Sequence, residues 1–127
     1  MCIPRDDMPQ IDMADLPGLL AYLNTKKIIL ISDVNYPPTW LVPKQCLNQT
    51  RPATNPKLAT KPLLISRDLY IIDGHHRWMM HMEQYKADAS WRVRCFQLDR
   101  EFDECCAAIA SYPGAYKLGD GPQPYRI

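Results

Sequence analysis

The chain has 127 residues, which is enough for one domain around a single hydrophobic core and too few for two ordinary domains. Its hydrophobic fraction of 46% is typical of a soluble globular protein, and no apolar run approaches the roughly 20 residues of a membrane span. Fifteen basic and fourteen acidic residues give a net charge of +1, so no global field draws it to nucleic acid or anionic lipid. We expect a single domain over residues 1–127 with a Pro-rich tail at 112–127, and phosphate binding only at a local site.

The cysteines and the N-terminus both favour a reducing, cytoplasmic location. Five cysteines form no CxxC pair, and their odd number fits poorly with a closed disulfide framework. The first residues, MCIPRDDMPQ, carry acidic side chains and prolines where a secretory signal needs a basic start and an apolar core. We therefore expect all five cysteines to occupy core or incidental positions.

The first half of the chain predicts one helix and one strand after an extended lead-in at residues 1–11. Leucines at 16, 19, 20 and 23 follow helical spacing, with Asp12 or Asp15 available as N-cap, and this helix should end near Asn24. Residues 26–32 form a short apolar run with β-branched side chains, which is typical of a buried strand. From 33 to 62 the chain is rich in proline and predicts loops, with a short strand at 40–42.

The second half predicts a hairpin, a helix, a strand and a last helix. Residues 63–66 and 69–72 flank a tight turn at Arg67-Asp68, where Leu69 is unusual because glycine is the easier residue. After Gly74 the pattern becomes helical, with Trp78, Met82 and Tyr85 on one stripe. A strand near 91–96 and a helix with its apolar face at 102–109 follow. The fold class is α/β or α+β, with a small mixed sheet and flanking helices.

The junction between the second hairpin strand and the next helix predicts a phosphate site. The first N–H groups of a helix lack intrahelical partners, and the helix dipole is positive at that end. Gly74 lets the backbone turn sharply and approach a ligand closely. Arg77 is a permanent planar cation that suits phosphate oxygens, and His75 and His76 can donate hydrogen bonds or transfer protons.

Asp73, at the strand end, is placed to hold a divalent metal or to orient a histidine. We therefore predict Asp73, His75 and His76 as catalytic residues and Asp73 as the metal ligand. A zinc site is the weaker alternative, because adjacent histidines rarely converge on one metal and no Cys or third His has ligand spacing. His81, one turn beyond Arg77, is expected at the surface or behind the site.

The run from Ile72 to Trp78, Ile-Asp-Gly-His-His-Arg-Trp, resembles the DGHHR motif of the ParB/sulfiredoxin superfamily. That superfamily includes partition-protein domains that bind CTP, sulfiredoxins and free-serine kinases, and its motif follows a β-hairpin and begins a helix. Residues 61–68 resemble the stretch before the motif in small phage and bacterial ParB-like members. Pro43-Lys44-Gln45 resembles a Pro-x-Gln segment upstream in these members, and residues 5–11 resemble their N-terminal segment. The strong resemblance covers about residues 61–80.

The resemblance implies a nucleotide site made of Gly74, His75, His76 and Arg77, to which Lys61 and Gln45 are added from the two upstream segments. It implies Mg²⁺ with ATP, ADP or CTP as the bound group. His75 stands where sulfiredoxin has its reactive cysteine, so reduction of a sulfinic acid is not expected. The family's serine kinases use an acidic general base from elsewhere in the chain, for which Asp6, Asp7 and Asp33 are the candidates here.

Three functions follow as hypotheses. The first is an enzyme that hydrolyses a nucleotide or transfers a phosphoryl group with Mg²⁺. The second is a ParB-like nuclease or DNA-binding protein, which the near-neutral charge disfavours because backbone binding requires a basic stripe. The third is a non-catalytic phage protein that binds a host protein. All three place the protein in the cytoplasm of a bacterium or a phage-infected host cell.

Overall fold

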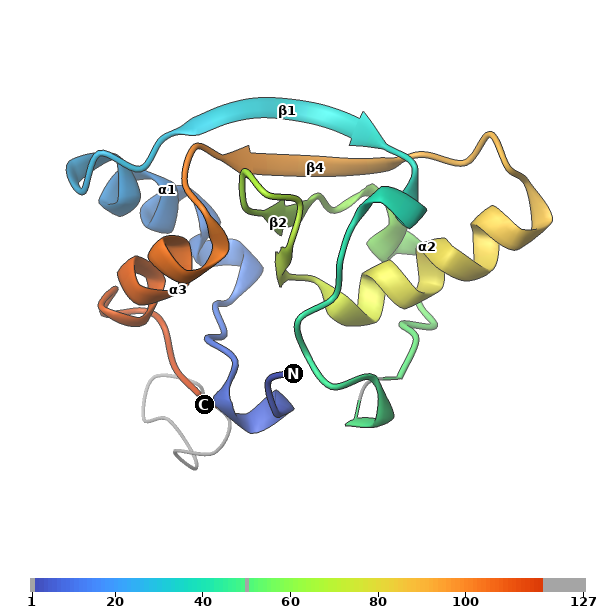
Figure 1. Cartoon of the computed structure of the whole chain (residues 1–127), viewed down its shortest axis with the longest axis horizontal. Coiled ribbons are helices and arrows are strands. Elements are labelled where there is room, and N and C mark those ends of the chain that lie inside the picture. The colour runs from blue at the N-terminus through green and yellow to red at the C-terminus, as the bar shows by residue number, and fades with distance from the viewer. Residues whose placement is uncertain (1, 50, 118–127) are drawn as a thin grey trace.

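The computed structural model describes residues 2–49 and 51–117, and the last ten residues of the predicted tail lie outside them. The described chain is a mixed α and β fold, as predicted (Figure 1). Its helices are α1 (Leu16–Thr25), α2 (His75–Ala87) and α3 (Phe102–Ala110), and its strands are β1 (Leu30–Tyr36), β2 (Leu63–Ile65), β3 (Ile71–Asp73) and β4 (Val93–Leu98). Short 3-10 turns occur at Arg5–Asp7, Met13–Asp15, Pro38–Trp40, Leu47–Gln49 and Pro56–Thr60. No helix among the described residues has both the length and the apolarity to cross a membrane.

The four strands form one mixed sheet in the order β1-β4-β2-β3. β4 runs antiparallel to β1 and parallel to β2, and β2 runs antiparallel to β3. The last strand of the chain is therefore inserted between the first strand and the hairpin. This order leaves β1 and β3 at the two edges, and β3 leads directly into α2.

The sheet separates two hydrophobic clusters because successive side chains of a strand point to opposite faces. On one face, Leu64, Ile72 and Leu98 pack with α1 and α3. On the other, five strand residues pack with Leu41 and with Trp78 of α2: Leu63, Ile65, Ile71, Val93 and Cys95. Figure 1 shows α1 and α3 side by side, with α2 set apart from them.

α1 follows its sequence pattern, and the strand after it does not. Leu19 and Leu23 are buried, and Asp15 is the residue at the N-cap position. The predicted buried strand at 26–32 is wrong in both position and burial, because Lys27 adopts a positive φ of 62° and β1 begins only at Leu30. Ile28 is buried, whereas the next three apolar residues, 29–31, are 38–49% exposed on the edge of the sheet.

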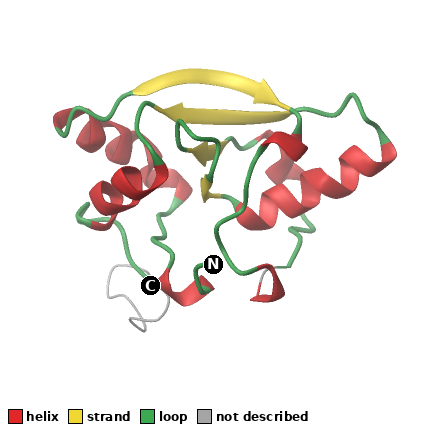
Figure 2. Ribbon diagram, viewed as in Figure 1, coloured by secondary structure: helices red, strands yellow, loops and turns green. Residues whose placement is uncertain are grey.

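The long connection from β1 to β2 is mostly loop (Figure 2). The predicted short strand at 40–42 is absent; Trp40 ends a 3-10 turn, and Val42 forms only an isolated bridge with Tyr70. The hairpin at 63–72 is confirmed. Leu69 adopts a positive φ of 69°, the conformation for which glycine would be easier.

The helix predicted after Gly74 is confirmed, but its buried face differs from the predicted one. Met82 and Tyr85 are only partly buried, whereas Met80, His81 and Arg77 join Trp78 in the interior. Met82 still packs against the cluster that contains Trp78, so apolar spacing predicts part of the buried face and misses its polar side chains. β4 and α3 lie where the sequence predicts them, with Cys105 and Ile109 buried in α3.

The expectation that no cysteine is paired is wrong. Cys2 and Cys46 form a disulfide that joins the N-terminal segment to the loop after Pro43. The other three cysteines are free, with Cys95 and Cys105 buried and Cys106 partly so, in agreement with a packing role. Burial raises the pKa of each of these three thiols to about 12, so they stay protonated at neutral pH.

Candidate functional site

Gly74 forms the turn between β3 and α2. Its φ of 108° is a left-handed conformation that side chains rarely adopt, and a Cβ at this position would overlap the Leu63 side chain. The backbone can make this turn and pack closely against β2 because residue 74 has no side chain. The hairpin, the turn and the helix therefore place residues 73–77 at one point, as the sequence predicts.

A cavity of about 120 Å³ lies at this turn. It is lined by Ile72 and the five motif residues 73–77, together with Gln45 and Gln10. Six of the seven residues that the sequence assigns to the site thus meet here. Lys61 is the exception; it is exposed and follows the 3-10 turn at Pro56–Thr60. Gln10 was missed because it lies far from the motif in the sequence and an isolated glutamine carries no pattern.

Arg77 is buried and bonded to the fold on two sides. Its Nη1 donates to Pro62 O at 2.7 Å, and its Nη2 lies 3.1 Å from Asp73 Oδ2 in an ion pair. The two side chains are 9% and 18% exposed, respectively. Burial raises the pKa of Asp73, and the nearby Arg77 guanidinium offsets only part of that effect. The Arg77 guanidinium therefore joins α2 to β3 and to the residue just before β2.

His75 points inward and is held by backbone groups. Its Nε2 accepts from the N–H groups of Lys44 and Gln45, at 3.1 and 3.2 Å. Burial, with a smaller contribution from His76, lowers the pKa of His75 to about 4. A ring nitrogen that accepts two N–H groups must be unprotonated, so His75 is neutral at pH 7 and fixes the 43–46 loop to the motif.

His76 lies nearer the surface and has a different environment. Its Nδ1 is 2.7 Å from Arg51 O, and because a carbonyl only accepts, Nδ1 carries the proton. In the neutral ring, Nε2 is then the basic nitrogen. The backbone of the same residue accepts from Ala53 N at 3.0 Å, so segment 51–53 lies along the first turn of α2. The two adjacent histidines thus have different roles in the fold.

The loop that carries Gln45 is tied to the N-terminal segment as well as to His75. Ile3 N donates to Lys44 O at 2.7 Å, and Cys46 N donates to Ile3 O at 2.9 Å. The Cys2–Cys46 disulfide closes the same contact covalently. The site is therefore assembled from three distant parts of the sequence: residues 2–10, 43–46 and 72–77.

Several residues considered from the sequence lie elsewhere. Asp33 pairs with Arg94 across β1 and β4, with 2.8 Å between Oδ2 and Nη2, and Asp6 and Asp7 are exposed in the first 3-10 turn. None of the three lines the cavity.

His81 is buried, so of the two positions expected for it, at the surface or behind the site, the surface position is wrong. It is 1% exposed, and its Nδ1 accepts from Trp91 Nε1 at 2.9 Å. Burial is the main reason that its pKa is lowered to about 4, with Arg77 as a smaller cause. Its Nε2 is buried and has no hydrogen-bond partner among the described residues. His81 is therefore a neutral interior residue that orients Trp91.

The donors around the motif cavity suit a hard cation better than zinc. Within the described ranges 2–49 and 51–117, no group of three or more His, Cys, Asp or Glu side chains converges as metal ligands. Three residues that line the cavity carry side-chain oxygens, namely Asp73, Gln45 and Gln10. Mg²⁺ commonly binds one or two protein oxygens and completes its shell with water and substrate phosphate, so this set fits it.

Comparison of the chain with protein-family models, with curated proteins and with solved structures gives no match. The resemblance to the ParB/sulfiredoxin superfamily therefore stays a prediction from the motif. The geometry around residues 72–77 is the basis for the proposals that follow.

Proposed function

We propose that this protein binds a nucleoside phosphate with Mg²⁺ at the start of α2 and hydrolyses it or transfers its terminal phosphoryl group. The observation that carries the proposal is the cavity formed by residues 72–77, Gln45 and Gln10 at a helix N-terminus. It joins polar side chains, an arginine and backbone donors in one place. Such a combination is suited to an anion that is transferred rather than merely bound.

The backbone supplies the phosphate donors in this proposal. The first α2 hydrogen bond runs from Trp78 N to Gly74 O, at 2.8 Å, so the amides of residues 75–77 precede it. Arg77 adds a positive charge to the same wall, although its pairing with Asp73 limits the net field. The helix start, more than the arginine, therefore provides the attraction.

The size of the cavity limits what it can hold. A volume of 120 Å³ is below the roughly 300–1,000 Å³ of sites that enclose a small organic ligand. It suits a phosphate group with a few waters. The sugar and base of the nucleotide would therefore lie outside this cavity.

Asp73, Gln45 and Gln10 would hold the Mg²⁺ that enters with the nucleotide. When bound, the ion would neutralise phosphate charge that develops during transfer. Asp73 can bind the ion only as an ionised carboxylate, and its burial disfavours the ionised form. Metal binding should therefore release a proton from Asp73 in the pH range where it is protonated.

His76 is the proton-transfer group in this proposal. Its Nδ1–H is held by Arg51 O, which leaves Nε2 to accept a proton from water or from an acceptor hydroxyl. His75 is unsuited to this step because its Nε2 already accepts two backbone N–H groups. We assign His75 the task of holding Gln45 at the cavity.

The test is isothermal titration with ATP, ADP and CTP, with and without Mg²⁺, combined with a phosphate-release assay. His76→Ala should lower turnover by about 100-fold or more, the usual contribution of a general base, while nucleotide affinity changes little. Lys57→Ala is the matched control, because Lys57 is exposed and does not line the cavity. Lys61→Ala tests the residue that the resemblance assigns to phosphate binding. If none of the three nucleotides binds the parent protein, the proposal fails.

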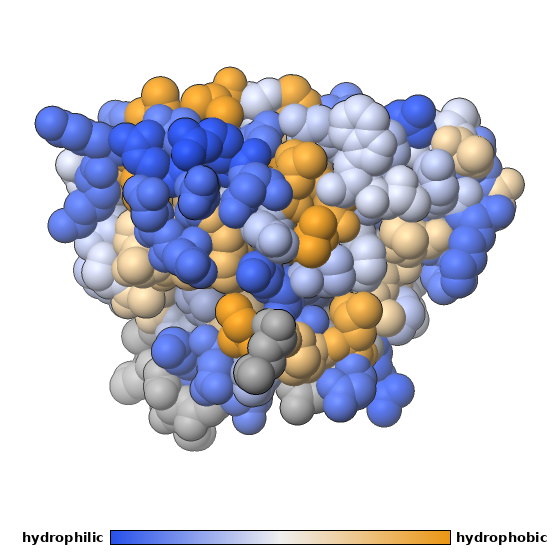
Figure 3. All heavy atoms as spheres, in the orientation of Figure 1, coloured by the Kyte–Doolittle hydropathy of each residue, from blue (hydrophilic) through white to orange (hydrophobic). Residues whose placement is uncertain are grey.

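A second candidate function, binding to another protein, is favoured by the edge of the sheet. Ile29, Leu30 and Ile31 are 44%, 38% and 49% exposed, and β1 lies at one edge of the sheet that the described residues form. Figure 3 shows hydrophobic surface along the upper edge of the view, above β1. Exposed apolar edges pair readily with other chains. Ile31→Lys should abolish capture of such a partner and leave nucleotide binding unchanged.

A cytoplasmic location remains our proposal from the odd number of cysteines, which fits poorly with a closed disulfide framework. The Cys2–Cys46 disulfide is more typical of an oxidising compartment, so the two features disagree. Thiol labelling of the protein in intact cells separates them, because a cytoplasmic protein should present both cysteines as reduced thiols.

A further inference from the structure

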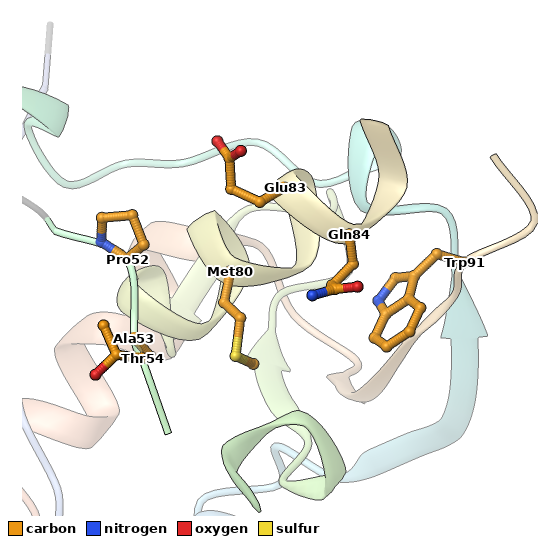
Figure 4. Close-up of a pocket in the computed structure, with 7 residues that line it drawn as sticks. All are labelled: Pro52, Ala53, Thr54, Met80, Glu83, Gln84 and Trp91. Carbon is orange, nitrogen blue, oxygen red and sulfur yellow. The ribbon is translucent and has the colours of Figure 1, made fainter. Parts of the chain in front are cut away.

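A second and larger cavity lies along α2, away from the motif. Its volume is about 370 Å³, within the usual range for sites that bind small organic molecules. One wall is the extended segment 52–54, the opposite wall is Trp91, and Met80, Glu83 and Gln84 of α2 complete it (Figure 4). This cavity has the room that the motif cavity lacks.

The walls of this cavity favour a flat ligand without negative charge. Pro52, Ala53, Met80 and the Trp91 ring are mostly apolar, and no Lys, Arg or His lines the space among the described residues. A phosphate or carboxylate would meet no cation there. A flat ring would instead gain stacking against the indole and contact with the methionine sulfur.

The face of the Trp91 ring can contact a ligand in this cavity, whereas the indole N–H is already bonded within the protein. The indole Nε1–H donates to His81 Nδ1 at 2.9 Å, and His81 is itself buried. In Figure 4 the Gln84 amide extends toward the Trp91 ring. An amide beside an aromatic ring offers a donor and an acceptor to the edge of a stacked heterocycle, as glutamine does for adenine.

The linings of the two cavities include residues from one face of α2. His76, Met80 and Gln84 are spaced four residues apart, and residues at this spacing lie on the same helix face. The helix rises about 12 Å from His76 to Gln84, a span suited to the sugar and phosphates of one nucleotide. Ala53, which lines the larger cavity, also donates its N–H to His76 O at 3.0 Å.

We infer that this cavity binds the base of the nucleotide, stacked on Trp91 and hydrogen-bonded by Gln84. The inference rests on the proposed function, since it takes the phosphate to lie at the start of α2. It identifies the substrate class as a nucleotide recognised through its base as well as its phosphates. Glu83 has no part in recognition, because its carboxylate pairs with Lys86 at the surface, at 3.3 Å.

Probes that carry one half of a nucleotide distinguish binding at the larger cavity from binding at the motif cavity. Adenosine and cytidine test the base site, and ribose 5-phosphate tests the phosphate site, each by isothermal titration with the full chain. We expect at least one nucleoside to bind and to shift the NMR signal of the Trp91 indole N–H. Gln84→Leu should weaken that binding by about threefold to tenfold, the effect of one lost hydrogen bond.

Glu83→Gln is the matched control, because it changes a neighbouring exposed residue on the same wall and removes only its charge. It should leave nucleoside affinity within about twofold if the ligand is neutral, a change smaller than one hydrogen bond provides. A large loss in Glu83→Gln would mean that the cavity prefers a cation and would overturn the inference. Failure of both nucleosides to bind at millimolar concentration, or equal affinity in Gln84→Leu, would also overturn it.

The same experiment distinguishes this inference from the proposed function. If a nucleoside binds and Gln84→Leu weakens it while ribose 5-phosphate and Mg-ATP do not bind, the phosphate site is wrong and the base site stands. If ribose 5-phosphate binds and neither nucleoside does, the phosphate site stands and the base site is wrong.

Discussion

The two faces of the sheet are built from different kinds of side chain. On the face covered by α1 and α3, every buried helix residue is apolar or a cysteine. On the face covered by α2, three of the five buried helix residues are polar, namely His75, Arg77 and His81. Each polar group is there at a cost, because burial removes its hydration and only specific partners compensate for that. The first face is explained by apolar packing alone, whereas the second also depends on hydrogen bonds and an ion pair to its buried polar groups.

The two faces should therefore differ in what controls their stability. Substitutions on the apolar face should lower the free energy of unfolding according to the side-chain volume they remove, and this effect should depend little on pH. Substitutions on the α2 face should change the free energy of unfolding through the ion pairing and protonation of its buried polar groups. Three substitutions, from the largest expected effect to the smallest, and then a change of pH test that division.

Replacing Arg77 with Met should lower the free energy of unfolding by about 3–5 kcal/mol, the usual result of removing one partner of a buried ion pair. The Asp73 side chain is only 18% exposed, and the substitution removes the cation that pairs with it. The substitution also removes the hydrogen bond from Arg77 Nη1 to Pro62 O. Urea denaturation measures the change. The double variant Asp73→Asn with Arg77→Met should recover part of the loss, because the uncompensated charge is gone. An unchanged stability in Arg77→Met would mean that this arginine does not hold the fold.

Replacing Ile109 with Ala should cost about 2–5 kcal/mol, which is typical of a large-to-small change in a packed core. Ile109 is fully buried in α3, on the face opposite the motif. Nucleotide affinity, measured by titration under conditions where the variant is folded, should stay within error of the parent. A large loss of affinity would show that the two faces are not independent.

Replacing Gly74 with Ala should cost about 1–3 kcal/mol, since it forces a side chain into a left-handed conformation. The new Cβ would also press against Leu63 and approach the Arg77 guanidinium. Thermal unfolding measures the stability, and titration measures nucleotide binding. We expect nucleotide affinity to fall by more than the added fraction of unfolded protein explains, because the turn sets the direction of the α2 amides that would donate to the phosphate.

Acidification should destabilise the α2 face. The pKa of both His75 and His81 is lowered to about 4, against 6.5 for a free histidine. The folded state therefore binds fewer protons than the unfolded state between pH 6.5 and 4. The stabilisation that these neutral histidines provide is fully present above pH 6.5. It falls by up to about 1.4 kcal/mol per pH unit per histidine as the pH drops toward 4.

His75→Gln provides the control for this pH dependence, because its amide oxygen can accept from Lys44 and Gln45 without titrating. The variant should lose about half of the slope measured by denaturation at a series of pH values. Asp73 acts with the opposite sign, since its raised pKa makes the folded state bind a proton more readily as the pH falls. An unchanged slope in the variant would show that His75 is not the cause.

The sequence predicts those parts of the fold that local pattern controls. The α1 leucines, the hairpin around Leu69 and the junction at Gly74 each carry a periodicity or a backbone requirement that short segments reveal. The misplaced strand at 26–32 shows the limit of this reasoning, because an apolar run can lie on an exposed sheet edge as well as in a core.

The sequence predicts which motif residues lie together at the cavity, but not how they are bonded. Asp73, the histidines and Arg77 were found from the motif, but the burial of Arg77 and the capture of His75 by the 43–46 loop depend on tertiary contacts. The Cys2–Cys46 disulfide was missed for the same reason, since cysteine spacing says nothing about which loops meet. Gln10 joins the site only through the folding of the N-terminal segment.

The central claim is that the start of α2 binds phosphate, and amide NMR tests it most directly. Adding Mg-ATP or Mg-CTP to ¹⁵N-labelled protein should shift the amide signals of His75, His76 and Arg77, because their N–H groups would donate to the phosphate. Amides of α3 residues such as Ile109, on the opposite face of the sheet, should not move. Saturating shifts confined to residues 73–77 and the larger α2 cavity would support the account. Shifts elsewhere, with no change at residues 75–77, would contradict it.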